Sequence, residues 1–128
     1  MECTDLYING RWVPGAGGAR FDVINPADER VLASVASAEI ADADAALDAA
    51  EAAMKDWAAR TPRDRSEVLR KAWELMTARQ EAFARLITRE NGKARADAMG
   101  EAGYAAEFFR WFAEEAVRAD GLITRAPA

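Results

Sequence analysis

The spacing of apolar residues changes from a strand pattern to a helix pattern near residue 37. Before that point, short apolar runs alternate with turn signals. The stretch LYINGRWV, residues 6–13, places two such runs around Asn9-Gly10, a pair that favours the type I′ turn of a β-hairpin. FDVIN (21–25) and RVLASVA (30–36) predict two further strands joined by a turn at Pro26. Because an isolated two-stranded hairpin is marginally stable, we expect other elements to cover it.

Beyond residue 37 the apolar residues recur every three or four positions, which predicts amphipathic helices. A second helix is expected to start at Thr61-Pro62, a capping residue followed by proline, and to end at Asn91-Gly92, with a bend near residues 78–80. The stripe of the first helix consists of Ile40, Ala43, Leu47, Ala50, Met54 and Trp57.

The third helix, about residues 95–120, carries most of the aromatic side chains and stops at Gly121. Its internal Gly100 and Gly103 each cost about 1 kcal/mol relative to alanine, so we expect a neighbouring element to pack closely there. The predicted organisation is β strands over residues 1–36, three long amphipathic helices over residues 37–121, and a short tail over residues 122–128.

The composition is typical of one soluble globular domain, with 128 residues of which 51% are hydrophobic and 30% charged. A net charge of -5 leaves no basic patch of the kind that nucleic acid or an anionic membrane requires, so neither is expected as a partner. No apolar run is long enough to span a membrane, and the first residues, MECTDLY, lack the features of a secretory signal. We therefore expect a cytoplasmic protein.

The residues that could carry chemistry are few, because the chain has no histidine and a single cysteine, Cys3. It therefore lacks the usual general base near neutral pH and any Ser–His or Cys–His pair. Cys3 has acidic neighbours and no cation to favour its thiolate, so we interpret it as inert. The GAGG stretch, residues 15–18, lacks the G-x-G-x-x-G spacing and a following helix, which favours a flexible connector over a phosphate loop. The tryptophans Trp12, Trp57, Trp73 and Trp111 are interpreted as core residues rather than as a ligand cage.

Five segments, in order along the chain, resemble the beginning of an NAD(P)-dependent aldehyde dehydrogenase. They are LYINGRWV, FDVINPADERVLASVA, DADAALDAAEAA, RENGK and GEAGYAAEFFRWFAEEAVRADG, and the last is similar to the succinate-semialdehyde dehydrogenase branch. The resemblance implies the family's α/β fold, with this chain as the N-terminal portion of the cofactor-binding domain. It also implies oxidation of an aldehyde, succinate semialdehyde in that branch, to the carboxylic acid with NAD or NADP. Ala94, where the family usually has proline, and the final GLITRAPA depart from the pattern.

The groups that react in this family have no counterpart in the sequence. They are a cysteine nucleophile, a glutamate that activates water, an asparagine that helps to bind the oxyanion, and a glycine-containing turn at the cofactor. We therefore expect no catalytic and no cofactor-binding residue in this chain, no tight binding of NAD or NADP, and no activity of the chain alone.

Two sites implied by the resemblance fall on residues that are present. The family often holds a structural monovalent cation near an acid at the position of Glu90, with a backbone oxygen from the position of Ile24. A solvated glutamate near a helix end explains Glu90 equally well. Gly100, Tyr104 and Phe108 share one helix face at four-residue spacing, and the family places this face at the mouth of its substrate channel. Ordinary core packing is the alternative for these three residues.

Two hypotheses follow for the partners of the chain. In the first, the rest of an aldehyde dehydrogenase fold, or a second copy of the chain, covers its apolar surfaces. In the second, the chain is a free-standing helical protein-interaction module without catalysis, which uses the hairpin edge and the aromatic helix face.

Overall fold

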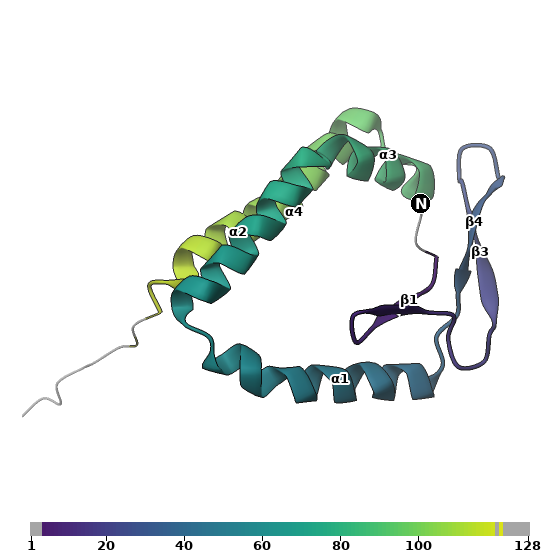
Figure 1. Cartoon of the computed structure of the whole chain (residues 1–128). Helices are drawn as coiled ribbons and strands as arrows, with labels where there is room; N and C mark the ends of the chain where they lie inside the picture. Colours follow the sequence, from purple (N-terminus) through teal and green to yellow (C-terminus); the bar gives the residue numbers. More distant parts are fainter. Residues whose placement is uncertain (1–3, 120, 122–128) are drawn as a thin grey trace, which may run out of the picture.

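The computed structural model describes residues 4–119 and 121, which form an open frame of two β-hairpins and four helices (Figure 1). Helices α2 and α4 lie side by side along one side of the frame, with α3 at their end, and α1 forms a separate side. Cys3 and the tail over residues 122–128 lie outside the described residues. The elements are β1 (Leu6–Ile8), β2 (Arg11–Val13), β3 (Arg20–Ile24), β4 (Val31–Ala36), α1 (Ile40–Ala59), α2 (Pro62–Ala78), α3 (Gln80–Asn91) and α4 (Arg95–Ala116).

Strands β1 and β2 form the predicted hairpin. They pair antiparallel around Asn9 and Gly10, whose φ angles of 50° and 76° suit a type I′ turn. Tyr7 and Trp12 are cross-strand partners, and their ring centroids lie 5.0 Å apart. The Asn-Gly pair thus sets the register that brings the two aromatic rings together.

Strands β3 and β4 form a second antiparallel hairpin, with a register shift between Val23 and Ile24. The Arg20 guanidinium of β3 links it to the segment before β1. It donates to the Asp5 carboxylate at 2.8 Å and to the Thr4 hydroxyl at 2.8 Å. The same guanidinium donates to the Ser34 carbonyl of β4 at 2.7 Å, so one side chain joins three segments.

The start of α1 is fixed by Asp42, a residue that is only 7% exposed. It accepts hydrogen bonds from the Glu39 N–H at 2.9 Å and from the Ala16 N–H, with its two oxygens at 3.0 and 3.1 Å. An acid in the first turn of a helix is favourable because free N–H groups point out of that end. The same acid also holds the glycine-rich connector, which is therefore tethered rather than freely flexible.

The helix expected between residues 61 and 92 is divided at Arg79, within the predicted bend. Thr61 caps the first part, since its hydroxyl accepts from the Asp64 N–H at 3.1 Å. Arg79 leaves the helical conformation, with φ -112° and ψ 12°, and α3 starts at the next residue. Gly92 ends α3 in the left-handed conformation, with φ 76°. The three long helices of the prediction are therefore four helices.

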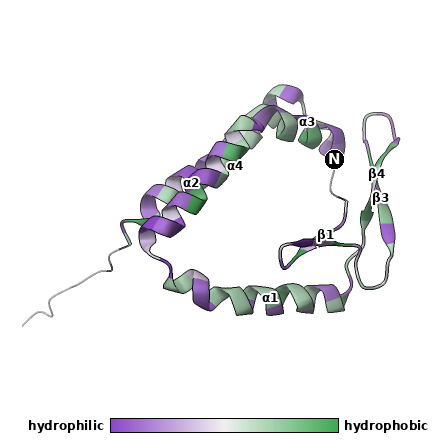
Figure 2. Ribbon diagram, in the orientation of Figure 1, coloured by the Kyte–Doolittle hydropathy of each residue, from purple (hydrophilic) through white to green (hydrophobic). Residues whose placement is uncertain are grey.

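The interior of the frame is built from small side chains. Among the described residues the buried apolar positions are all alanines, namely Ala36, Ala84, Ala98, Ala102, Ala106 and Ala113. Four of these belong to α4, which packs its alanine side against α2 and α3. Large apolar side chains lie mostly on the outside. Figure 2 shows that α1 is hydrophobic along most of its length, whereas α2 and α4 mix hydrophobic and hydrophilic positions.

The interpretation of the tryptophans as core residues needs correction. Trp12, Trp57 and Trp111 are exposed, so core packing does not hold for them, and only Trp73 is partly buried. The reason is that the alanines, not the aromatics, occupy the helix contacts.

None of the helices in residues 4–119 is long and apolar enough to cross a membrane.

Candidate functional site

The outer side of α4 carries an aromatic face, which we define as Tyr104, Phe108, Trp111 and Phe112. Together with Glu107 these residues line a surface depression of about 330 Å³. Tyr104 and Phe108, one turn apart, meet edge to face with ring centroids 4.9 Å apart and planes at 78°. This is a favoured arrangement for two aromatic rings, so the pair forms an ordered apolar wall.

The aromatic face continues toward α2. A second depression of about 300 Å³ is lined by Leu69 of α2 and by Phe108, Phe109 and Phe112 of α4. Phe108 and Phe112 border both depressions, so the two form one apolar surface. Sequence spacing explains this geometry: the alanines of α4 face inward, and the aromatic residues occupy the remaining helix positions.

The two glycines of α4 have different surroundings. Gly103 faces the Gln80 side chain, whose amide nitrogen donates to the Met99 carbonyl at 2.9 Å; a Cβ at Gly103 would lie 2.8 Å from that nitrogen. This is the close packing that the sequence predicts. A Cβ at Gly100 would meet no described atom within 4 Å, so nothing in this chain requires glycine there. Gly100 therefore lies beside open space, one turn before Tyr104.

The predicted cation site involves the end of α3 and the second hairpin. Glu90 lines a cavity of about 150 Å³ with Val23 and Leu86, and Ile24 is not among its lining residues. A Cβ at Gly92 would lie 2.9 Å from the Pro26 ring, so the β3–β4 turn reaches the end of α3. No cluster of three or more acidic, histidine or cysteine side chains suited to a metal occurs among residues 4–119. A cation at Ile24 and Glu90 thus stays a prediction.

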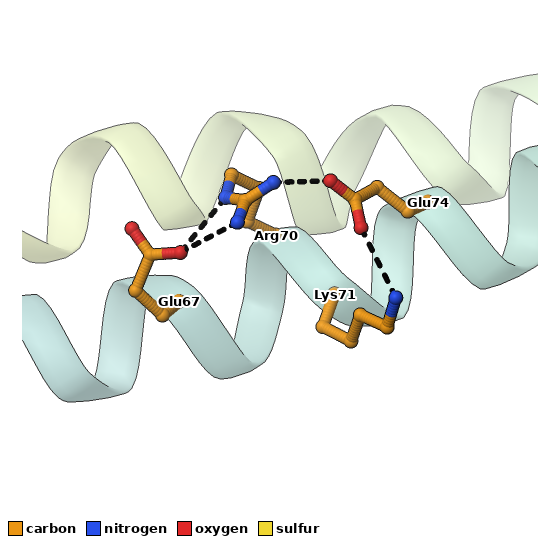
Figure 3. A network of polar contacts seen from close by, with 4 residues as sticks. All are labelled: Glu67, Arg70, Lys71 and Glu74. Carbon is orange, nitrogen blue, oxygen red and sulfur yellow. Dashed lines mark hydrogen bonds and ion pairs between the residues drawn. The ribbon is translucent and has the colours of Figure 1, made fainter.

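The described residues include an ionic network of four side chains on α2 (Figure 3), two of which, Glu67 and Arg70, border a depression shared with α4. Arg70 bonds Glu67, with a nitrogen–oxygen distance of 2.8 Å, and also pairs with Glu74, while Lys71 lies 3.4 Å from Glu74. The hydrogen bond to Glu67 and the charges of Glu67 and Glu74 raise the pKa of Arg70 above its ordinary value. An arginine is charged at neutral pH in any case, and these pairs are solvent-exposed. The network therefore supports the helix and supplies no reactive group.

The glycine-rich connector does not fit a dinucleotide phosphate. The N–H of Ala16, which a phosphate loop would offer to its ligand, instead bonds the Asp42 carboxylate. A Cβ at Gly17 would overlap the Glu39 carboxylate. Two carboxylates beside the loop repel a phosphate, and the loop is not followed directly by a helix. The connector thus does not have the geometry of a phosphate-binding loop.

Comparison with known proteins shows to which family the chain belongs. Residues 12–128 match the model of the aldehyde dehydrogenase family. The chain belongs to this family. Among its relatives are the glutarate-semialdehyde dehydrogenase of Pseudomonas putida, 44% identical over 90% of this chain, and the NADP-dependent succinate-semialdehyde dehydrogenase GabD of Escherichia coli, 44% identical over 89%. The crystal structure of an aldehyde dehydrogenase from Brucella melitensis biovar abortus 2308 covers 98% of the chain at 42% identity with a TM-score of 0.93.

The chain spans about a quarter of the length of these aldehyde dehydrogenases: 24% of the Pseudomonas and Escherichia enzymes and 26% of the Brucella structure. The family assignment and the N-terminal α/β resemblance made from the sequence are confirmed. Sequence reasoning missed Glu107, Trp111 and Phe112 as neighbours of the predicted channel residues. Their spacing of three, seven and eight residues from Tyr104 is the signal that could have added them, because residues at such intervals share one helix face.

Proposed function

We propose that this chain forms the N-terminal portion, residues 1–128, of the cofactor-binding domain of an NAD(P)-dependent aldehyde dehydrogenase. The family match over residues 12–128 is the observation that carries this proposal. The whole enzyme would oxidise an aldehyde that also bears a carboxylate, such as succinate semialdehyde, because the relatives named above are succinate- and glutarate-semialdehyde dehydrogenases. NAD and NADP both remain candidates for the oxidant. A cytoplasmic location agrees with the single cysteine.

In this proposal the chain helps to form and position the substrate channel, and it supplies none of the groups that react. The predicted channel residues Gly100, Tyr104 and Phe108 would form one wall at the mouth of the substrate channel. The apolar wall would contact the aldehyde's carbon chain, and the open space at Gly100 would leave room for another part of the enzyme. A monovalent cation at Glu90 and the Ile24 backbone would stiffen the junction between α3 and the second hairpin.

The function is tested in a chimeric enzyme. Residues 4–119 of this chain would replace the aligned segment of Escherichia coli GabD, which is 44% identical to it over 114 residues. We expect the chimera to reduce NADP⁺ with succinate semialdehyde. Tyr104→Ala and Phe108→Ala should raise KM for the aldehyde by about tenfold, roughly the loss of one apolar contact, whereas Lys55→Ala on exposed α1 should not.

The chain alone should be silent in the same assay, because it offers no thiolate nucleophile and no cofactor cradle. A folded, NADP-binding chimera without aldehyde-dependent reduction would contradict the proposed function. The proposal that this chain supplies no reacting group would be contradicted if the purified chain reduced NADP⁺, if that activity survived repurification, and if Cys3→Ser abolished it.

A second function is favoured by one observation: Tyr7, Trp12 and the aromatic face are exposed together in the isolated chain. Exposed apolar surface of this extent marks protein contacts, so a free-standing interaction module is the alternative. A cleanly monomeric chain that unfolds cooperatively without any added partner would favour the module.

A further inference from the structure

Helix α1 carries a regular apolar seam on one side. Its residues alternate in steps of three and four, which is the spacing of a coiled-coil contact. Large side chains occupy every seventh position, and alanines occupy most of the positions between them. The seam consists of Ile40, Ala43, Leu47, Ala50, Met54 and Trp57.

The seam is uncovered in this chain. The exposed fractions of Ile40, Leu47, Met54 and Trp57 are 82%, 68%, 64% and 41%. The contacts of α1 with the rest of the chain are mainly with β1, and the only shielded positions on the helix are Asp42 and Ala49. At about 3.6 residues per turn, Ala49 lies almost opposite Leu47. The hairpin therefore touches the helix on the side away from the centre of the seam.

The composition of the seam indicates what fits it. Alanines at Ala43 and Ala50 allow a second helix to approach closely, at the short end of the usual 8–10 Å range, while Leu47 and Met54 would interlock with its side chains. One edge of the seam is acidic, because Asp44 and Glu51 lie three and four residues from Leu47 and so flank it on the helix surface. The complementary surface is therefore an apolar helix with basic residues along one edge.

A second copy of α1 does not meet this description. The helix has five acidic residues and one lysine, so its net charge is -4 from 1 - 5. In an antiparallel pair the two acidic edges, each with Asp44 and Glu51, would face each other and repel. Charge thus disfavours an antiparallel dimer formed through this seam, and the net charge of -4 on each helix opposes a parallel one as well.

The known structures point to where the partner is found. Helix α1 stands apart from α2 and α4 in the frame (Figure 1), and the same arrangement occurs, with a TM-score of 0.93, within an aldehyde dehydrogenase chain about four times as long. A helix with so few contacts inside its own segment needs support from the remainder of such a chain to keep this position.

We propose that the α1 seam binds a basic-edged helix belonging to the remaining three quarters of an aldehyde dehydrogenase. This inference rests on the proposed function, and it deepens it by naming the surface that joins the two parts. The acidic edge makes the contact sensitive to ionic strength, because salt screens exposed charge pairs.

The test uses the whole 128-residue chain with an affinity tag, co-expressed with Escherichia coli GabD that lacks its aligned N-terminal quarter. Four versions of the chain are compared: the unchanged sequence, Leu47→Lys, Met54→Lys, and Ala52→Lys as the matched control. Ala52 is exposed and lies on the opposite side of α1, so it receives the same new side chain without touching the seam. The GabD part recovered with each chain is quantified, and each chain alone is sedimented over a range of concentrations.

We expect the unchanged chain and Ala52→Lys to retain the GabD part, and each seam variant to lose about tenfold or more of it. Equal recovery with all four chains, or no recovery with the unchanged chain, would overturn the proposal. Self-association that is lost with both seam variants and kept with Ala52→Lys would also overturn it, because the occupant would then be a second copy. A complex that forms through the seam and does not reduce NADP⁺ with succinate semialdehyde would contradict the proposed function and leave the seam assignment standing.

Discussion

Replacing the two glycines of α4 by alanine should affect stability differently, although both lie inside the same helix. In an exposed helix interior, alanine is more favourable than glycine by about 1 kcal/mol. Gly100→Ala adds its methyl group to open space, so the full gain of about 1 kcal/mol is expected. Gly103→Ala places its methyl group 2.8 Å from the Gln80 amide nitrogen, which must move.

Moving Gln80 costs its hydrogen bond to the Met99 carbonyl. A neutral hydrogen bond of this kind contributes about 1 kcal/mol, which offsets the helix gain at Gly103. The net effect of Gly103→Ala is then near zero, and the two single variants should differ by about 1 kcal/mol in the free energy of unfolding.

Urea unfolding of the chain, followed by far-ultraviolet circular dichroism, measures this difference. With a slope of about 2 kcal/mol per molar urea, 1 kcal/mol moves the midpoint by about 0.5 M. In a Gln80→Ala background the obstacle is gone, so Gly103→Ala should there gain the same 1 kcal/mol or so as Gly100→Ala. If the two glycine variants are equally stabilising in the unchanged background, Gln80 does not occupy the space beside Gly103.

Three further outcomes are expected. Asp42→Asn should destabilise the junction of connector and helix by about 1–2 kcal/mol, which faster amide hydrogen exchange there would show. Asp44→Asn, at an exposed position, should change little, and equal effects of the two variants would refute the role of Asp42 in holding the connector. Sodium or potassium should raise the melting temperature of the chain and not that of Glu90→Gln; identical responses would remove the cation site. Phe108→Ser or Trp111→Ser should weaken concentration-dependent self-association and hydrophobic dye binding, and unchanged association would exclude the aromatic face as its cause.

Local signals in the sequence were sufficient for the hairpin turn and for two helix ends, whereas α4 ends at Ala116, before the predicted stop at Gly121. Asn9-Gly10 accepts the positive φ angles of the hairpin turn, Thr61 caps α2, and Gly92 ends α3, each through an interaction within a few residues. The break at Arg79 lies in a stretch without glycine or proline. Its new helix is held by Gln80, which bonds a residue 19 positions away, and such a contact has no local signature.

The sequence predicts which residues of the candidate site share a helix face, but it does not predict whether that face is buried or exposed. The four-residue interval correctly placed Tyr104 and Phe108 together. Periodicity shows that residues share a helix face, but it does not show what covers the face. On α4 the alanines, such as Ala102 and Ala106, make the helix contacts, and the bulky side chains stay outside. The tether at Asp42 was missed for a similar reason, since its partner Ala16 is 26 residues away.

Small and large side chains occupy different places in this chain, so the helices can pack against one another while many large apolar residues stay uncovered. Contacts between α4 and its neighbours use alanines, which let the helices approach closely but remove little apolar surface from water per residue. Many of the large side chains, on which most hydrophobic stabilisation depends, are exposed, and the α1 seam, the aromatic face and the first hairpin are three regions where they gather. Helix caps and turn residues thus specify the local shape of each element. Hydrophobic free energy that holds the elements in place relative to one another would come from surfaces that cover these three regions. An open frame that matches 26% of an aldehyde dehydrogenase chain is the form expected of the proposed N-terminal portion, whose packing partners would lie elsewhere in the enzyme.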